Sequence, residues 1–234
     1  MPLYRIADFV FDIEPLYDYT LSLCKDYEVT GEAANFSVRA TLAECEAEAA
    51  RALTPATLAY SEALIVYRKI CDLLAPRGVI LLHGATVKTG GRAYAFCAPS
   101  GTGKTTHIRL WLSLFPDRVT VLNGDKPLLR REGESFTVYG TPWCGKEGWN
   151  KNDKAPLSAI CFLERGEKNA IRRLSKEEAL GRIFEQLLKP SGALGIDGLL
   201  STVDGLLSAV PMFLLSCNIS EEAARLSYDT LTHA

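Results

Sequence analysis

The stretch from Ala98 to Thr106 constrains this chain more than any other, because small residues lead directly into a lysine and two threonines. The residues read Ala-Pro-Ser-Gly-Thr-Gly-Lys-Thr-Thr. An apolar run ends at Cys97, and helical spacing begins at His107. A strand, a loop of small residues and a helix opening on Gly-Lys-Thr are typical of a phosphate-binding P-loop. The alternative is a glycine-rich turn with an exposed lysine.

The chemistry of such a loop assigns a role to each residue. Small side chains let backbone N–H groups surround a polyphosphate, and the following helix adds unpaired N–H groups. Lys104 is expected at the β- and γ-phosphates, and the Thr105 hydroxyl at Mg²⁺. Ala98 stands where the commoner pattern has glycine, and its small side chain should leave the loop intact. The expected nucleotide-binding residues are Ser100, Gly101, Thr102, Gly103, Lys104, Thr105 and Thr106.

Composition excludes several other classes of protein. The chain has 234 residues, 47% of them hydrophobic, and a formal net charge of −2. This charge gives no global positive field for nucleic acid, and no apolar stretch is long enough to span a membrane. The first residues lack a signal-peptide pattern, so we expect a cytoplasmic protein. The 7 cysteines include no pair at C-x-x-C spacing, which argues against a zinc site or a disulfide framework.

Two further candidates follow apolar runs that read as buried strands. His83 follows residues 79–82, and Asp125 follows residues 119–122 by a short turn. An aspartate at a strand end, one helix after a P-loop, is typical of the residue that organises Mg²⁺. A turn aspartate is the alternative for Asp125, and a structural histidine is the alternative for His83.

Residues 141–152 form an unusual loop with two tryptophans, two glycines, two lysines and two asparagines. This composition suits a mobile lid over a substrate or a phosphate group. The alternative is a packed surface loop that its tryptophans anchor. The candidates for contact with substrate are Lys146, Lys151 and Asn152 of this loop, with Arg165 after the next strand.

The order of expected elements places the chain in the α/β class. Residues 1–40 read mainly as β structure, and a capping box at Thr41 opens a helix to about Leu53. A longer helix is predicted to begin at Thr54-Pro55. From residue 79 onward strands alternate with helices, which indicates a P-loop kinase-like mixed sheet flanked by helices. We expect a small α+β N-terminal elaboration over residues 1–75 and a nucleotide-binding domain over residues 76–234.

The second half of the sequence also contains alternating strand and helix patterns. The pattern predicts a strand over Leu157–Leu163 and a helix from a capping box at Ser175 to about Lys189. A second apolar helical stripe follows over residues 196–210, then a strand over residues 212–217 and a terminal helix from Ser220. We find no catalytic or binding motif in these elements and expect them to support the fold.

Three segments together resemble the superfamily of HPr kinase/phosphorylase and ATP-dependent phosphoenolpyruvate carboxykinase. They are Leu82-His83-Gly84-Ala85, the P-loop over residues 100–106, and Val121-Leu122-Asn123-Gly124-Asp125. The resemblance covers residues 79–130 well and residues 135–217 in outline, whereas residues 1–75 resemble neither enzyme's other domain. It implies that His83 lies near the γ-phosphate and that Asp125 matches one aspartate of the family's Asp-Asp pair. The second acid is missing, because the neighbours of Asp125 are Gly124 and Lys126; pairing Asp125 with Gly124 keeps the strand and turn lengths.

The resemblance implies an ATP- and Mg²⁺-dependent kinase that phosphorylates a hydroxyl of a small molecule or of a peptide serine. Lys146, Lys151 or Arg165 would add positive charge around the transferred group, and His83 or Asp125 would take the proton. The missing acid favours an alternative, a nucleotide-binding regulatory module with impaired catalysis. The chain is too short for the large second domain of a phosphoenolpyruvate carboxykinase. Kinases of this family are often oligomers, so a homo-oligomer is a further implication.

Overall fold

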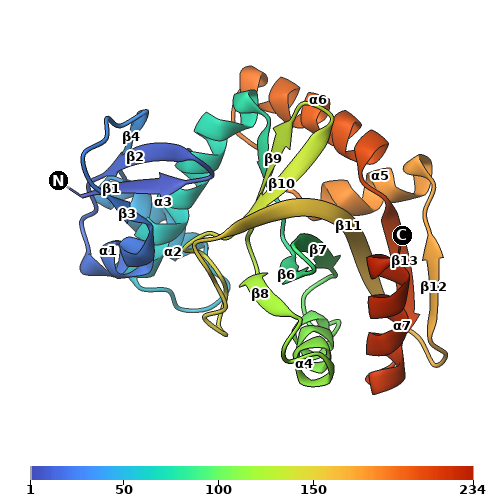
Figure 1. Cartoon of the computed structure of the whole chain (residues 1–234). Coiled ribbons are helices and arrows are strands. Elements are labelled where there is room, and N and C mark those ends of the chain that lie inside the picture. Colours follow the sequence, from blue (N-terminus) through green and yellow to red (C-terminus); the bar gives the residue numbers. More distant parts are fainter. Residues whose placement is uncertain (1, 234) are drawn as a thin grey trace.

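Two sheets organise the chain (Figure 1). The computed structural model describes residues 2–233. The smaller, 4-stranded sheet has the order β3-β1-β2-β4 and is built from the N-terminal residues. The larger, 9-stranded sheet is curled and carries helices on its faces, so the chain is a mixed α/β protein. Among the described residues, none of the helices combines the length and apolar character needed to cross a bilayer.

The N-terminal part contains a sheet and three helices. The strands are β1 (Leu3–Ile6), β2 (Phe9–Ile13), β3 (Glu28–Val29) and β4 (Phe36–Val38), and the helices are α1 (Asp18–Cys24), α2 (Leu42–Arg51) and α3 (Leu58–Leu74). Strands β1 and β2 form a tight hairpin because Ala7 and Asp8 both adopt positive φ angles, 52° and 63°. Helix α1 was not predicted. Its start is fixed by a distant residue, since Glu62 of α3 accepts hydrogen bonds from the Leu16 backbone and the Thr20 hydroxyl.

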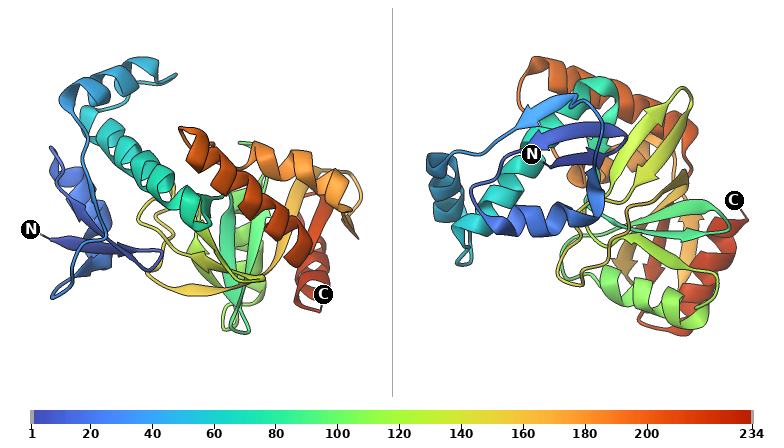
Figure 2. Two further views of the ribbon diagram at one scale, coloured as in Figure 1. Left: turned by 90° about the horizontal axis from the view of Figure 1, so that it is seen from above. Right: turned by 60° about the vertical axis from the view of Figure 1, so that its left-hand side comes forward.

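The first residues of α2 and α3 show how well the side chains that cap a helix could be predicted from the sequence. The capping box at Thr41 is confirmed, with the Thr41 and Glu44 side chains each bonded to the other's backbone N–H. Helix α3 begins later than predicted, because the Thr57 side chain, rather than Thr54, accepts the first free N–H from Tyr60. Figure 2 shows α3 lying between the small sheet and the rest of the molecule.

The larger sheet contains the remaining strands: β5 (Val79–Leu81), β6 (Ala85–Thr89), β7 (Arg92–Cys97), β8 (Thr120–Asn123), β9 (Leu128–Glu132), β10 (Ser135–Tyr139), β11 (Lys154–Arg165), β12 (Ala170–Arg173) and β13 (Met212–Cys217). The sequence predicts a hairpin before the P-loop, with residues 86–88 and 92–97 joined by the turn Thr89-Gly90-Gly91, and the structure confirms it as β6 and β7. Strand β11 is longer than the predicted 157–163, because its first residues pair with β10 and its last residues with β7 and β13. Strand β12 was not predicted; it pairs antiparallel with β13.

Four helices cover the two faces of this sheet: α4 (Lys104–Leu114), α5 (Lys176–Glu185), α6 (Ala193–Ala209) and α7 (Glu221–Thr232). Helices α5 and α6 pack on one face, where Ile183 and Leu206 are fully buried. Helices α4 and α7 pack on the other, where Ile108 and Trp111 are fully buried. Helix α5 ends at Glu185 instead of the predicted Lys189, and Leu187 pairs with Leu82 in a short bridge.

A third core cluster joins the N-terminal part to the larger sheet. It contains residues of α3 such as Tyr67 together with Leu81 of β5, Leu128 of β9 and the loop residue Trp143. The predicted boundary after residue 75 falls in a short 3₁₀ turn, Ala75–Arg77. The division into two domains stays a prediction, but apolar residues from both sides of that boundary bury one another.

Candidate functional site

The loop between β7 and α4 contains two glycines at positive φ and leads into a helix without a side-chain cap. Gly101 and Gly103 adopt φ angles of 78° and 116°, in the region that side chains disfavour. Helix α4 begins at Lys104, and no side chain caps its first turn. The first N–H groups of a helix have no partner within the helix, so they remain available to an anion.

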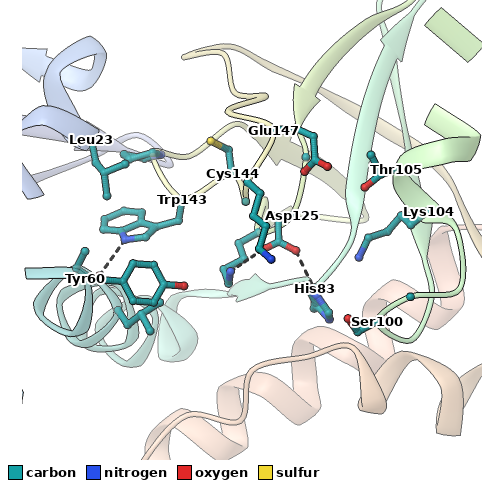
Figure 3. Close-up of a pocket in the computed structure, with 18 of the residues that line it drawn as sticks. Leu23, Tyr60, His83, Ser100, Lys104, Thr105, Asp125, Trp143, Cys144 and Glu147 are labelled. Carbon is teal, nitrogen blue, oxygen red and sulfur yellow. Dashed lines mark hydrogen bonds and ion pairs between the residues drawn. The ribbon is translucent and has the colours of Figure 1, made fainter. Parts of the chain in front are cut away.

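This loop lines one end of a cavity of about 750 Å³ (Figure 3). The cavity brings together most of the residues that the sequence singled out: His83, Ser100, Gly101, Gly103, Lys104, Thr105, Thr106, Asp125 and Lys146. Thr102 lies outside it and lines a second cavity of about 540 Å³. Gly101, Gly103 and Thr106 line both cavities, so the loop separates two hollows.

Asp125 is held as an anion by hydrogen bonds from two neighbouring side chains. His83 lies with Nε2 3.2 Å from Asp125 Oδ1, and the Lys126 ammonium pairs with Oδ2. Burial alone would raise the pKa of Asp125, but the hydrogen bonds from His83 and Lys126 outweigh it and hold that pKa far below its ordinary value. Lys126 was not predicted, although it directly follows Asp125.

Lys104 is a half-buried cation of the site. Burial lowers the pKa of its ammonium, and the charge of Asp125 acts in the opposite direction. A desolvated ammonium interacts more strongly with an anion than an exposed one does, because less water screens the charge. The cavity therefore contains a cation poised for a negatively charged ligand.

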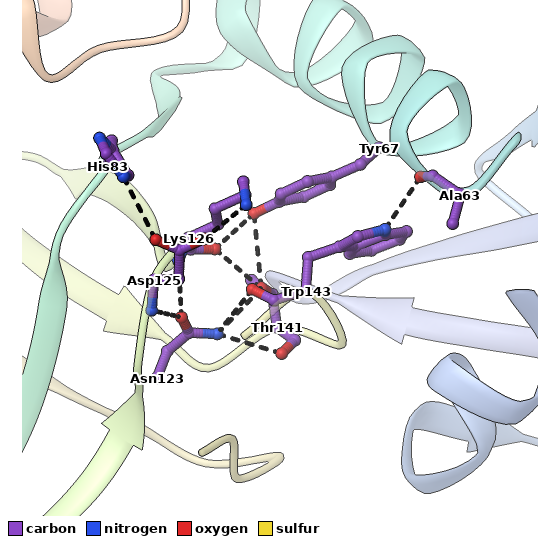
Figure 4. Close-up of polar contacts among 8 residues, drawn as sticks. All are labelled: Ala63, Tyr67, His83, Asn123, Asp125, Lys126, Thr141 and Trp143. Carbon is purple, nitrogen blue, oxygen red and sulfur yellow. Dashed lines mark hydrogen bonds and ion pairs between the residues drawn. The ribbon is translucent and has the colours of Figure 1, made fainter. Parts of the chain in front are cut away.

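Asn123 builds the turn that carries Asp125 (Figure 4). Its Oδ1 accepts hydrogen bonds from the backbone N–H groups of Asp125 at 2.9 Å and Lys126 at 2.7 Å. Its Nδ2 donates to the backbone carbonyls of Thr141 at 3.1 Å and Trp143 at 3.3 Å. The side chain is fully buried and ties the strand end to the next loop. Asparagine at a strand end is a weak sequence signal, since turns favour it in general.

Helix α3 holds the start of that loop. The Trp143 ring stacks on Tyr67 and its Nε1 donates to the Ala63 carbonyl at 2.9 Å. The Tyr67 hydroxyl donates to the Lys126 carbonyl at 2.7 Å. Trp143 and Cys144 are buried, so this part matches the alternative of a loop anchored by a tryptophan. Residues 145–148 are exposed and are bounded by Gly145 and Gly148, and Lys151 and Asn152 at the end of the loop are exposed as well.

The four lid candidates do not gather. Lys146 lines the cavity. Lys151 and Asn152 lie outside it, and the Asn152 side chain instead donates to the Asp26 carbonyl at 2.8 Å. Arg165 donates to the Gly101 carbonyl at 2.7 Å and lines the second cavity. Lys151 donates its backbone N–H to the Leu122 carbonyl and does not reach this cavity, and contact of Lys151 and Asn152 with a substrate stays a prediction.

The missing acid beside Asp125 has a steric explanation. A Cβ on Gly124 would lie 2.9 Å from the Cys144 carbonyl oxygen and 3.2 Å from the Trp149 Cβ. Position 124 therefore has no room for a side chain, and position 126 is a lysine. Another carboxylate, Glu147, lines the same cavity and lies near Thr105 in Figure 3. Sequence analysis missed Glu147, which has no motif around it.

Comparisons with known proteins give one distant structural likeness. No family model and no curated protein matches the chain. One solved structure that it resembles is the Hpr(Ser) kinase/phosphatase from Coxiella burnetii, at 12% sequence identity and a TM-score of 0.36. The match covers 65% of this chain and 98% of that chain. At this TM-score the likeness carries no conclusion about the fold or the activity of this chain.

Proposed function

We propose that this protein is an ATP- and Mg²⁺-dependent kinase that transfers the γ-phosphoryl group to a hydroxyl of a small molecule or of a peptide serine. One observation carries the proposal: the uncapped start of α4, with Lys104, lines the same cavity as the Asp125–His83 pair. Phosphoryl transfer depends chiefly on positioning and on neutralising charge, and these groups supply both.

The two cavities beside the loop suggest an orientation for the bound nucleotide. A polyphosphate lying over Gly101 and Gly103 has Lys104, His83 and Asp125 on one side only. The γ-phosphate therefore belongs in the cavity with these groups. The nucleoside belongs in the second cavity, where Leu110 and Ile219 offer apolar surface.

The chain also offers donors suited to Mg²⁺. This ion accepts oxygen ligands, usually one or two protein groups with water and substrate phosphates completing the shell. The Thr105 hydroxyl and the Asp125 carboxylate line one cavity and are of that kind. Among residues 2–233 no cluster of three or more histidine, cysteine, aspartate or glutamate side chains exists, which leaves no fully protein-built metal site there. When bound, the ion would neutralise phosphate charge.

The proposed transfer conserves atoms and charge. The acceptor oxygen forms a bond to the γ-phosphorus while the bond from that phosphorus to the bridging oxygen breaks, and ADP leaves with the electron pair. His83 accepts the hydroxyl proton in this proposal. Its Nε2 is turned to Asp125, and a neutral imidazole that donates from one nitrogen can accept at the other. Asp125 is the weaker candidate because its low pKa makes it a poor base.

One specific observation favours a second candidate, a nucleotide-binding module without catalysis. Asp125 has no acidic neighbour, and Lys126 already pairs with its carboxylate. Such a module would bind nucleotide tightly and would phosphorylate no acceptor.

Phosphorus NMR of MgATP with pools of hydroxyl metabolites and serine peptides distinguishes the two candidates. The kinase proposal expects a new phosphoester resonance with the wild type, none with Lys104→Ala, and the wild-type result with Lys189→Ala, which replaces an exposed lysine away from the cavity. ATP that binds but stays unchanged in every pool would instead favour the regulatory module. Normal turnover by Lys104→Ala would overturn the P-loop assignment.

A further inference from the structure

The cavity extends well beyond the phosphate-binding end. Its far end is formed by helices α1 and α3 and by the start of the 141–152 loop. Figure 3 shows Leu23, Tyr60 and Trp143 at this end, Lys104 and Thr105 at the other, and Asp125 with His83 between them. The residues of the far end are Tyr19, Leu23, Tyr60, Ala63, Leu64, Pro142, Trp143 and Cys144.

One wall of this far end is fixed. Trp143 is only 5% exposed, its ring lies 4.1 Å from that of Tyr67, and its N–H is bonded to the Ala63 carbonyl. A side chain held on both its face and its polar edge has little freedom to move. The wall is therefore formed before any ligand arrives.

The rim carries two uncovered aromatic rings. Tyr19 is 41% exposed and Tyr60 is 44% exposed, and their ring centroids lie 6.4 Å apart at an interplanar angle of 56°. Large side chains exposed beside a cavity leave apolar surface in contact with water, and a ligand that covers this surface gains affinity. The rings belong to α1 and α3, in the N-terminal part for which the sequence suggested no function.

The far end selects against a polar ligand. None of its eight lining side chains is charged, and only the two tyrosines carry hydroxyl groups. A sugar or polyol bound there would exchange most of its water contacts for apolar ones, and unpaired polar groups are costly to bury. An apolar skeleton loses no such contacts. Among the charged groups of the cavity, Lys126 comes from the turn after β8, and Lys146 and Glu147 come from the part of the loop that follows Cys144.

We infer that the far end is the acceptor subsite, and that the acceptor is an alcohol attached to an apolar, aromatic group that lies against Tyr19, Tyr60 and Trp143. This inference rests on the proposed kinase function, because it places the reacting hydroxyl toward His83 and Asp125. Both a free aromatic alcohol and a peptide serine beside an aromatic residue have this chemistry. A sugar or a polyol does not.

Two matched pairs of acceptors test the inference. Ethanol and phenethyl alcohol differ by one ring, as do the amides of N-acetyl-Ser-Ala and N-acetyl-Ser-Phe. In at least one pair we expect the aromatic member to show a kcat/KM at least about tenfold higher with the wild type, the scale of discrimination that an apolar contact provides. The pair that responds identifies the source, a small alcohol or a peptide.

Variants of Tyr60 test whether the preference for the aromatic acceptor arises at the rim of the cavity. Tyr60→Ala should reduce the preference for the aromatic member to nearly one, whereas Tyr60→Phe keeps the ring and should keep the preference. Leu200→Ala, at a 50% exposed leucine of α6 away from the cavity, is the control and should behave as the wild type. Equal rates for both members of each pair would overturn the inference. So would a Tyr60→Ala variant that keeps its preference but changes oligomeric state in sedimentation, since the rim would then be a contact between subunits.

A binding measurement separates this inference from the kinase proposal. Saturation-transfer NMR detects bound phenethyl alcohol without any phosphoryl transfer. If no acceptor is phosphorylated, a signal with the wild type that Tyr60→Ala abolishes would support the subsite while the kinase proposal fails. If ethanol or glycerol is phosphorylated and phenethyl alcohol gives neither product nor signal, the kinase proposal survives and the subsite is wrong.

Discussion

Trp143 and Tyr67 stack with ring centroids 4.1 Å apart and planes only 2° from parallel. One residue belongs to the loop after β10 and the other to helix α3, so the pair joins the N-terminal part to the cavity. Tyr67 also bonds the Lys126 carbonyl, directly beside Asp125. A single stacked pair therefore connects the wall of the cavity to the turn that carries its aspartate.

Removing the Trp143 ring should destabilise the whole molecule. Trp143→Ala empties a buried site and leaves the Ala63 carbonyl without its donor, so we expect a loss of about 3–5 kcal/mol in the free energy of unfolding. Trp143→Phe keeps much of the stacked area and should lose less. Urea unfolding followed by circular dichroism measures both. A Trp143→Ala variant with the wild-type midpoint would show that the stack contributes little.

Asn123 should be more important for stability than an exposed asparagine. Asn123→Ala removes the acceptor for two backbone N–H groups and the donor for two carbonyls, and each buried polar group left unpaired costs about 1–3 kcal/mol. Asn152→Ala removes one surface bond to Asp26 and should cost less than about 1 kcal/mol. Chemical unfolding of the two variants tests this order. Similar losses for both would contradict the central role of Asn123.

Restoring an acid at position 124 should fail for steric reasons. Gly124→Asp and Gly124→Ala both place a Cβ against the Cys144 carbonyl, and overpacking of this kind costs about 1–3 kcal/mol. We expect both variants to melt at lower temperature and the aspartate variant to gain no turnover. Gly181→Ala is the matched control, because a Cβ there meets nothing within 4 Å and lies in helix α5. That control should be neutral or stabilising. A faster, equally stable Gly124→Asp would refute the steric account.

His83 and Glu147 should differ in their effect on turnover. If His83 takes the proton, His83→Asn should lower kcat by about a hundredfold or more. Glu147→Gln should then lower kcat less, because Glu147 contributes charge near Thr105 and no proton acceptance. Steady-state kinetics with the acceptor found by phosphorus NMR gives both values. The reverse order would assign proton acceptance to Glu147.

The stability of the folded state should depend on pH through the ionisation of Glu44. Hydrogen bonds from the Lys69 ammonium and from the Thr41 backbone lower the pKa of Glu44 from 4.5 to about 2. Because the folded pKa is the lower one, the carboxylate stabilises the folded state above pH 4.5 and this contribution is lost as pH falls toward 2. The difference in unfolding free energy between the wild type and Glu44→Gln should therefore shrink on acidification. The effect is modest, since the Glu44 side chain is 41% exposed. A difference that is constant with pH would contradict the assigned cause.

The features that sequence predicted well are those set by neighbours in the chain. The Thr41 capping box involves a residue three positions away, and the hairpin into the P-loop turns on Gly90 and Gly91, both at positive φ. The family resemblance implied that His83 and Asp125 both lie near the transferred phosphate, and the two residues line one cavity. Their roles stay predictions until activity is measured.

The features that sequence did not predict depend on distant residues. Helix α1 begins where Glu62 supplies its acceptor, and the lack of room at Gly124 is set by the carbonyl of Cys144. Lys151 and Asn152 were assigned to a lid because of composition alone, and that pattern did not predict the backbone bond from Lys151 to the Leu122 carbonyl. Local patterns contain no information on such contacts, which arise only when the chain has folded.

Strand β11 acts as a strut between the two parts of the molecule. Its 12 residues extend for roughly 40 Å at most. Lys154 at one end pairs with Asp8 of the N-terminal hairpin, and Arg165 at the other holds the Gly101 carbonyl. Swinging the N-terminal part away from the larger sheet would break the first contact and separate Trp143 from Tyr67. Such a motion would therefore also remove the wall that α3 contributes to the cavity.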